Sequence, residues 1–301
     1  MTAPSRNLSP RTTIRFRPPR FGLGGSPIGE LPGPDGDAVA TATVDAAYQA
    51  GIRFFDTAPH YGAGRSERRL GTALARHPRG EFLVSTRVGR LVTGDADFSA
   101  AGIRQSLSES LDRLAVSEID LVFIDEPGEL WQQAMDEACP ALLELREQGV
   151  ISALGAAMDD WQLLDRFVRD TEIDAVVIAG QFSLLDQSAL PLLDRCEARG
   201  VAAIASGVLT RHVLQPDQSK QSSDPLTIRA RRISAVCERY GVSVPQAALA
   251  FPSRHPAVTS VLIGAASPAE IRADAALVRQ PVPATLWRDP DLAKLITLPE
   301  R

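Results

Sequence analysis

The sequence predicts an α/β protein whose eight strands close into a (β/α)8 barrel, the TIM-barrel architecture. Two observations lead to this fold class: short apolar runs alternate with amphipathic stretches eight times, and polar side chains follow the ends of the runs. Eight alternations favour closure over an open, doubly wound sheet. No shift in composition marks a second domain, so we expect residues 14–301 to form one barrel domain after a disordered polar arm at residues 1–13.

The expected strands are short and rich in apolar residues, as buried parallel strands are. Residues 13–17 alternate apolar and polar side chains, and Pro18 and Pro19 predict a turn, so a short N-terminal hairpin should plug one end of the barrel. The eight barrel strands are expected at residues 21–25, 52–56, 82–87, 119–125, 150–156, 175–179, 201–205 and 258–263.

Between the strands, apolar residues recur every three or four positions, the spacing of an amphipathic helix. Asp37 is expected to cap the first helix, and Gly149 and Gly200 are expected to end two others. A polar loop at residues 215–225 precedes the last helices, and a Pro-rich tail should wrap the outside. The expected helices are 38–50, 66–76, 99–114, 133–148, 161–170, 189–199, 226–240, 245–251, 268–278 and, in the tail, 287–296.

Composition excludes several classes of function. A net charge of −5 gives no electrostatic footprint for nucleic acid, and no apolar run is long enough to span a membrane. The three cysteines have no CxxC spacing, which indicates a reducing, cytoplasmic setting and no structural metal. The Arg-rich N-terminus lacks the apolar region of a secretory signal; we interpret it as a flexible arm, with a transit peptide as the alternative.

Polar residues that follow different strands should converge, because the carboxyl ends of parallel barrel strands meet at one face. The most informative stretch is 52–62, a buried strand that runs into Asp56, His60 and Tyr61. Arg87 and Asp125 end the next two strands, so we expect a charge-assisted pair between them. A buried ion pair that only seals the top of the barrel is the alternative. Further polar or glycine residues after the strands are Glu126, Asp159, Ser206 and Gly264.

From Phe21 to about Trp287 the chain resembles the aldo/keto reductases, most closely the bacterial galactose- and fucose-type sugar dehydrogenases. The matching segments are 22–25, 56–62, 66–71, 85–90, 185–190 and 251–258. The resemblance implies a barrel that binds NADP(H) or NAD(H) across the strand ends without a Rossmann domain. It also implies a small-molecule substrate and a monomer or homodimer.

The family's catalytic residues are Asp, Tyr, Lys and His, and two of these four are replaced here. Asp56 and Tyr61 match the pattern, whereas Arg87 stands at the lysine position and Asp125 at the histidine position. The resemblance implies that Tyr61 donates a proton to a carbonyl oxygen while Arg87 favours the tyrosinate. Asp56 and Asp125 would then orient Arg87. His60 and Glu126 are candidate substrate-binding residues.

The cofactor-binding positions also depart from the family. Ala266 stands where the family has a basic residue for the adenosine phosphate, and Asp274 belongs to the segment near the adenine. Phe182 stands where an aromatic ring often stacks on the nicotinamide. Negative charge near a pyrophosphate is unfavourable unless it is compensated, so a chain that binds no nicotinamide is an alternative. The candidate cofactor-binding residues are Asp159, Phe182, Ser206, Gly264 and Asp274.

Three functions are compatible with this sequence. The first is an oxidoreductase that reduces a carbonyl or a conjugated C=C bond of a small molecule or secondary metabolite, because an acid replaces the histidine in the C=C-reducing steroid branch of the family. The second is a non-redox dehydratase, lyase, isomerase or cyclase that uses Asp56, Tyr61, Arg87 and Asp125 for acid–base chemistry. The third is a binding or regulatory barrel without catalysis.

Overall fold

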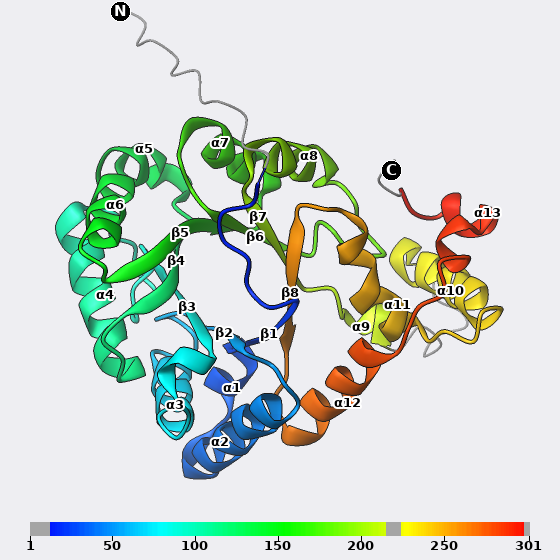
Figure 1. Ribbon diagram of the computed structural model, residues 1–301, viewed down its shortest axis with the longest axis horizontal. Helices are drawn as coiled ribbons and strands as arrows, with labels where there is room; N and C mark the ends of the chain where they lie inside the picture. Colours follow the sequence, from blue (N-terminus) through cyan, green and yellow to red (C-terminus); the bar gives the residue numbers. More distant parts are fainter. Residues whose placement is uncertain (1–12, 215–223, 298–301) are drawn as a thin grey trace, which may run out of the picture.

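The computed structural model describes residues 13–214 and 224–297 and confirms the barrel. Eight parallel strands pair in chain order, and β1 pairs with β8 to close the ring (Figure 1). The strands are β1 Phe21–Gly24, β2 Phe54–Asp56, β3 Leu83–Val88, β4 Ile119–Asp125, β5 Ile151–Met158, β6 Ala175–Ala179, β7 Ala202–Ser206 and β8 Val258–Gly264.

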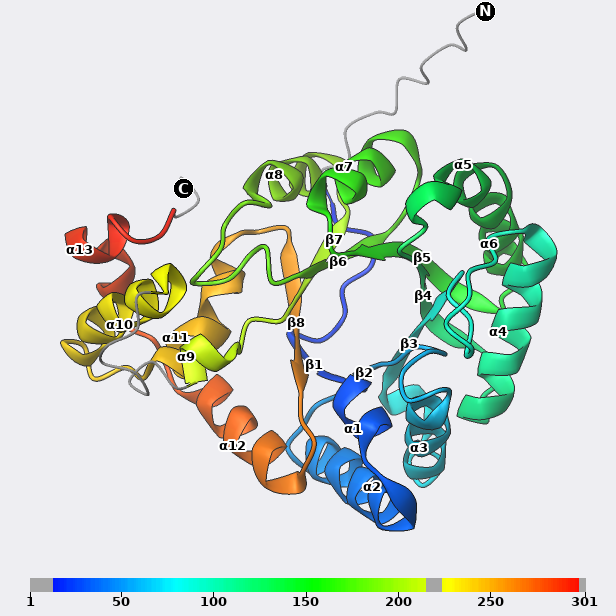
Figure 2. The ribbon, with the colours of Figure 1, turned by 180° about the vertical axis from the view of Figure 1, so that it is seen from behind.

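Helices surround the strands, and Figure 2 shows this ring from behind, with α1 beside β1 and β2. The α-helices are α1 Ser26–Glu30, α2 Gly33–Gln49, α3 Arg65–Leu74, α4 Ala100–Leu114, α5 Trp131–Gln133, α6 Cys139–Glu147, α7 Trp161–Asp170, α8 Leu190–Arg199, α9 Arg211–Leu214, α10 Pro225–Glu238, α11 Val244–Ala250, α12 Pro268–Arg279 and α13 Pro290–Ala293. Short 3₁₀ turns lie at Arg79–Glu81, Gly128–Leu130, Phe251–Arg254 and Leu286–Arg288, and a π-turn at Ala134–Ala138.

Two apolar layers hold the barrel together. Inward-facing residues such as Phe54, Leu121 and Phe123 fill the interior, and a larger cluster lies between the strands and the helices. Alternate residues of a strand point to opposite faces, so one strand supplies both layers. The interior is therefore a packed core.

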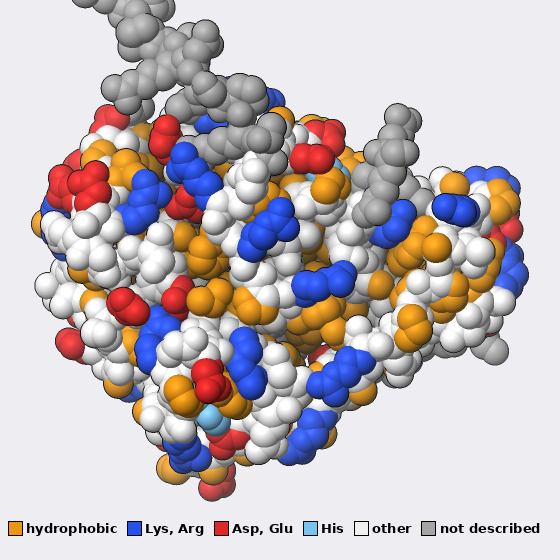
Figure 3. Space-filling view, viewed as in Figure 1, with side chains coloured by type: hydrophobic (Ala, Val, Ile, Leu, Met, Phe, Trp, Pro, Cys, Tyr) orange, Lys and Arg blue, Asp and Glu red, His pale blue; other side chains and the backbone are white. Residues whose placement is uncertain are grey.

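The expected N-terminal hairpin is wrong. Residues 13–20 form no strand; instead the Arg15 amide donates a hydrogen bond to the Gly200 carbonyl, just before β7. Pro18 and Pro19 have no N–H for a ladder, so this segment lacks a pairing edge. Ile14 and Phe16 nevertheless pack against the interior cluster and cover that end of the barrel. Figure 3 shows hydrophobic side chains gathered in the middle of this face.

Several helices differ from those expected, and the differences nearest the site follow β1. An unpredicted short helix, α1, follows β1, and α2 begins at Gly33 rather than near residue 38. Asp37 is therefore not a cap; its carboxylate pairs with Arg69 Nε at 2.7 Å. The arm at 1–12 and most of the loop expected at 215–225 lie outside the described residues, and in the tail only Leu286–Arg288 and Pro290–Ala293 are helical.

Candidate active site

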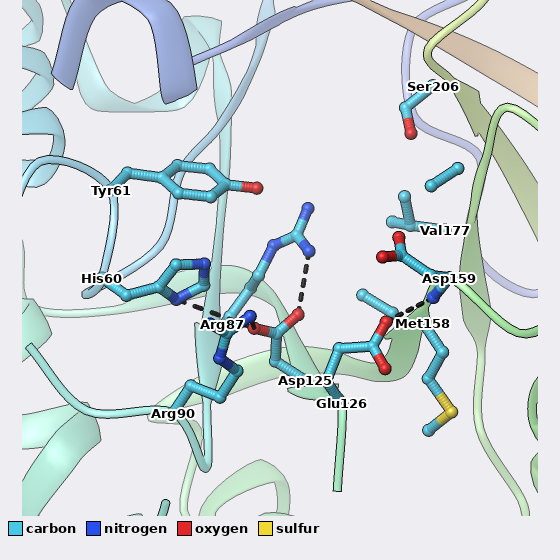
Figure 4. Close-up of a pocket in the computed structure, with 12 residues that line it drawn as sticks. His60, Tyr61, Arg87, Arg90, Asp125, Glu126, Met158, Asp159, Val177 and Ser206 are labelled. Atoms are coloured by element: carbon cyan, nitrogen blue, oxygen red, sulfur yellow. Dashed lines mark hydrogen bonds and ion pairs between the residues drawn. The ribbon is translucent and has the colours of Figure 1, made fainter. Parts of the chain in front are cut away.

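The polar residues that follow the strands surround one cavity of about 230 Å³ at the carboxyl end of the barrel (Figure 4). His60 and Tyr61 lie on one side of it, and Asp159 and Ser206 lie on the other. The lining residues are His60, Tyr61, Arg87, Arg90, Asp125, Glu126, Ala157, Met158, Asp159, Val177, Ala179 and Ser206. This end of a barrel is where TIM-barrel enzymes carry their chemistry.

Strand register brings Asp56, Arg87 and Asp125 together. Asp56 pairs with Ser85 on β3, and Arg87 pairs with Phe123 on β4. Arg87 is two residues beyond Ser85, and Asp125 is two residues beyond Phe123. The three side chains consequently point to the same, inner face of the barrel, since side-chain direction repeats every second residue.

Arg87 is clamped between two buried carboxylates. Its Nη1 lies 2.9 Å from Asp125 Oδ1, which confirms the expected contact, and its Nη2 lies 3.4 Å from Asp56 Oδ2. The Ser85 hydroxyl donates to the other Asp56 oxygen at 2.7 Å. Burial nevertheless raises the pKa of Asp56, with Arg87 and Ser85 opposing that rise. The clamp fixes the position of one positive charge beneath the cavity.

Tyr61 reaches the cavity from a tightly packed loop. Gly62 has φ +58°, and a side chain there would collide with the Gly29 carbonyl at the end of α1. The Gly62 amide also donates to Glu30 Oε1 at 3.0 Å, so α1 holds the loop in place. The Arg87 guanidinium carbon lies 5.4 Å from the centre of the Tyr61 ring.

Burial and the nearby Arg87 charge act on the pKa of Tyr61 in opposite directions. Burial raises the pKa of Tyr61 above its usual range, and the nearby Arg87 charge only partly opposes this effect. Asp56 and Asp125 raise the pKa of Tyr61 further. Arg87 therefore favours the tyrosinate as expected, but burial outweighs this effect, and the phenol keeps its proton at neutral pH.

His60 lies against Asp125, on the side that Arg87 leaves free. His60 Nδ1 is 3.7 Å from Asp125 Oδ2, and Arg90 Nη1 is 4.0 Å from the same oxygen. Both His60 Nδ1 and Asp125 Oδ2 are buried without a hydrogen-bond partner among the described residues. Burial lowers the pKa of His60, while Asp125 opposes the fall and the two arginines add to it.

The opposite wall of the cavity is acidic. Glu126 has a left-handed backbone, φ +47°, which is rare for a residue with a side chain and is found at functional sites. Its carboxylate accepts a hydrogen bond from the Asp159 amide. Burial raises the pKa of Glu126, the hydrogen bond from the Asp159 amide opposes this rise, and the Asp159 and Asp125 charges add to it.

Three of the expected cofactor-binding residues lie outside the cavity lining. Phe182 is buried in the core against Phe251 and His255, so it stacks on protein rather than facing the cavity. Gly264 ends β8 beside Pro27. Asp274 lies on α12, where burial, with Glu270 nearby, raises the pKa of Asp274 to about 6.

Sequence reasoning missed several lining residues. Arg90 was overlooked although it follows Gly89, whose φ of +98° turns the chain back toward the cavity after β3. Ala157, Val177 and Ala179 belong to strands whose apolar pattern looks like ordinary core. Their inward direction follows only from the register. Among residues 13–214 and 224–297, no group of three or more metal-ligating side chains forms a metal site, and no helix is long and apolar enough to cross a membrane.

The comparison with known proteins identifies the family. The family model described as aldo/keto reductase matches residues 20–287. The chain belongs to the aldo/keto reductase family. A D-threo-aldose 1-dehydrogenase from a Pseudomonas species is 34% identical, with 93% of this chain and 95% of that protein covered. A pyridoxal 4-dehydrogenase from Microbacterium luteolum is 33% identical, with 89% and 91% covered.

Solved structures of aldo/keto reductases share the fold. A glycerol dehydrogenase from Gluconobacter oxydans has a TM-score of 0.76 and 26% identity, with 97% of each chain covered. The holo form of an aldo/keto reductase from Bacillus halodurans has a TM-score of 0.77 and 22% identity, with 96% of each chain covered. The family match and the named dehydrogenase relatives make the protein an enzyme of an oxidoreductase family.

The residues present fit a nicotinamide at the mouth of this aldo/keto reductase barrel. A carboxamide both donates and accepts hydrogen bonds, and the wall opposite Tyr61 carries the Ser206 hydroxyl and the Asp159 carboxylate.

Proposed function

We propose that the protein is a nicotinamide-dependent oxidoreductase that interconverts a carbonyl and an alcohol on a small polar substrate. The observation that carries this proposal is the position of Tyr61, a protonated phenol at the cavity, beside a guanidinium clamped by two carboxylates. A phenol that keeps its proton is a hydrogen-bond donor and general acid for a carbonyl oxygen. A conjugated C=C bond is a second acceptor for the same proton.

The nicotinamide, when bound, supplies or accepts the hydride. The chain's own residues manage the charge and the proton. Tyr61 hydrogen-bonds the substrate oxygen and gives it a proton as negative charge develops there. Arg87 stabilises that negative charge from a fixed position, because Asp56 and Asp125 hold both of its terminal nitrogens.

The substrate class follows from the size and polarity of the cavity. About 230 Å³ accommodates a small molecule, and charged or hydroxyl groups line most of the cavity. The relatives named for aldose and pyridoxal oxidation act on small, hydroxylated aldehyde or hemiacetal compounds. We therefore propose a small hydroxylated aldehyde or ketone, or the corresponding alcohol, as the substrate.

NADH is the proposed cofactor in preference to NADPH. The family resemblance assigns the adenosine end to the segment after β8. Glu270 and Asp274 of this segment are acidic and Ala266 is small, whereas its cation, Arg272, is exposed on α12. The Glu270 carboxylate accepts the Ala266 amide at 2.8 Å. Carboxylates accept hydrogen bonds from ribose hydroxyls and repel a 2′-phosphate.

We also propose a cytoplasmic monomer or homodimer. The three cysteines are all free and buried, which suits a reducing compartment. Size-exclusion chromatography with light scattering distinguishes a monomer from a homodimer.

The proposed function is tested by calorimetric titration with NADH and NADPH, followed by turnover assays on small aldehydes, ketones, enones and sugars. Micromolar NADH binding and a carbonyl reduction that falls at least 100-fold in Tyr61→Phe support the proposal. A Tyr61→Phe variant with unchanged turnover contradicts it. If millimolar nucleotide fails to bind, the chemistry is not redox, and Tyr61, Arg87 and Asp125 become candidates for acid–base catalysis.

A further inference from the structure

His60 and Tyr61 are neighbours in the chain and line the same cavity, but their surroundings differ. Their rings meet edge to face with centroids 4.8 Å apart. Tyr61 lies beside the clamped Arg87, whereas His60 lies beside the oxygen of Asp125 that Arg87 does not bind. The two side chains are therefore linked to the same ionic cluster from different sides.

A protonated Tyr61 creates a problem for catalysis. When the phenol gives its proton to a substrate oxygen, a buried phenolate remains. Since burial raises the pKa of Tyr61, this phenolate is costly. A nearby group that returns the proton in the same event removes that cost.

His60 has the geometry of such a group. Its Nδ1 is buried and faces Asp125 Oδ2 at 3.7 Å, and neither atom has a hydrogen-bond partner among the described residues. A shift of less than 1 Å closes this pair, and hydrogen bonds of this kind are commonly long before substrate binds. With Nδ1 turned toward Asp125, Nε2 is the nitrogen that exchanges protons with the cavity. The ring is 17% exposed, so the cavity reaches it.

We propose that His60, anchored by Asp125, is the proton reservoir for Tyr61. The inference rests on the proposed oxidoreductase function. Asp125, which stands at the family's histidine position, cannot supply this proton path by itself, and His60 completes it. No direct hydrogen bond joins Tyr61 and His60 among the described contacts, so the proton crosses through a water in the cavity.

The proton and electron count closes in both directions. In reduction, the carbonyl carbon gains a hydride from the reduced nicotinamide, and the oxygen gains the Tyr61 proton as the C=O π bond breaks. Tyr61 regains a proton from the His60 imidazolium, which becomes neutral. In oxidation the same protons move backwards, and His60 ends protonated and releases its proton to solvent.

The groups that face His60 determine its titration. Asp125 on β4 favours the imidazolium, while Arg87 on β3, Arg90 after β3 and burial favour the neutral ring. Tyr61, on the same loop, is neutral in this range. The protonated form is therefore the minor form at neutral pH, and reduction should accelerate as the pH falls toward the pKa of His60.

The first experiment reads the imidazole without using activity. Protein labelled with ¹⁵N-histidine is titrated by NMR as wild type, His60→Gln and Asp125→Asn; the His60→Gln spectrum assigns the His60 signals. Loss of the carboxylate should lower the pKa of His60, because Asp125 is the group that raises it. His77, which lies 3.6 Å from Asp45 outside the site, is the control, and its signals should be the same in wild type and Asp125→Asn. An unchanged pKa of His60 in Asp125→Asn overturns the proposed anchoring.

The second experiment uses pH–rate profiles in both directions. Wild-type reduction should slow, and oxidation should accelerate, as the pH rises through the pKa of His60. His60→Gln should lose this inflection and about 100-fold in kcat, with nucleotide affinity unchanged. Imidazole added to His60→Ala should restore turnover, whereas His77→Gln should behave as wild type.

The outcomes separate the reservoir from the underlying function. A His60→Gln variant that retains the wild-type pH profile overturns the reservoir, even when Tyr61→Phe is inactive. A wild type that transfers no hydride to or from any substrate overturns both proposals.

Discussion

Arg87 and Asp125 face each other across neighbouring strands, with Nη1 2.9 Å from Oδ1, while the second terminal nitrogen of Arg87 reaches toward Asp56. Two almost fully buried carboxylates thus depend on one cation. The cation is planar, and both of its terminal nitrogens are used, which a lysine ammonium cannot reproduce geometrically. Substitution at Arg87 therefore separates the contribution of charge from that of geometry.

We predict that Arg87→Lys retains hydride transfer, whereas Arg87→Met loses it. Lysine keeps a positive charge near Tyr61, but methionine removes the cation that both Asp56 and Asp125 contact. Removal of one partner of a buried ion pair typically costs about 3–5 kcal/mol of stability. Urea unfolding and single-turnover kinetics measure the two effects separately. Equal activity of the Lys and Met variants would show that the Arg87 charge is not needed.

We predict that Asp274→Asn stabilises the protein at pH 7 and has no effect at pH 4. The folded-state pKa of Asp274 is about 6, above its usual 3.8, so the folded state prefers the protonated carboxyl. The cost of ionisation is absent below pH 4, grows between pH 4 and 6, and is complete above pH 6. With allowance for solvent screening at this half-buried site, the gain at pH 7 is about 1 kcal/mol. A gain of equal size at both pH values in urea unfolding contradicts this assignment.

We predict that Ala266→Arg increases NADPH affinity about tenfold and leaves NADH affinity nearly unchanged. An arginine at this position introduces a cation for the 2′-phosphate on the segment assigned to the adenosine. Ala269→Arg, on the exposed first turn of α12, adds the same charge three residues away and serves as the control. Comparable NADPH gains in both variants would indicate a general charge effect rather than a phosphate contact.

We predict that Phe182→Leu lowers stability by about 1–2 kcal/mol but changes nucleotide affinity less than twofold. Phe182 packs its ring against Phe251 at 5.1 Å and against His255 at 6.1 Å, so its loss removes core contacts. Calorimetric titration with NADH distinguishes a core position of Phe182 from a role in which its ring stacks on the nicotinamide. A tenfold weaker affinity in the folded variant would mean that the side chain moves to the nicotinamide.

The sequence was sufficient for the barrel and for the convergence of Asp56, Arg87 and Asp125. Both follow from local rules: strand–helix alternation specifies the barrel, and alternate residues near the carboxyl ends of adjacent strands share a face. The contact between Arg87 and Asp125 could be predicted from their opposite charges and their positions at the ends of neighbouring strands.

The remaining features depended on three-dimensional packing. Residues 13–20 have a strand-like pattern, but the closed barrel offers them no free strand edge to pair with. The segment therefore forms no hairpin and instead packs across the end of the barrel. Burial is the main cause of the raised pKa of Tyr61, and the depth of burial cannot be derived from the charges that neighbour Tyr61 in the sequence. Arg90 enters the cavity through a left-handed glycine turn, and Phe182 turns inward to Phe251.

The N-terminal cover of the barrel has a practical consequence. Ile14 and Phe16 close the end where the strands begin, and Arg15 is tied there to Gly200, whereas the cavity opens where the strands end. A surface linker attached upstream of residue 13 should therefore immobilise the protein with its cavity facing the solution. On a sensor chip or in a flow reactor, substrate could then still reach the cavity, and no residue at that end of the barrel would need to be changed.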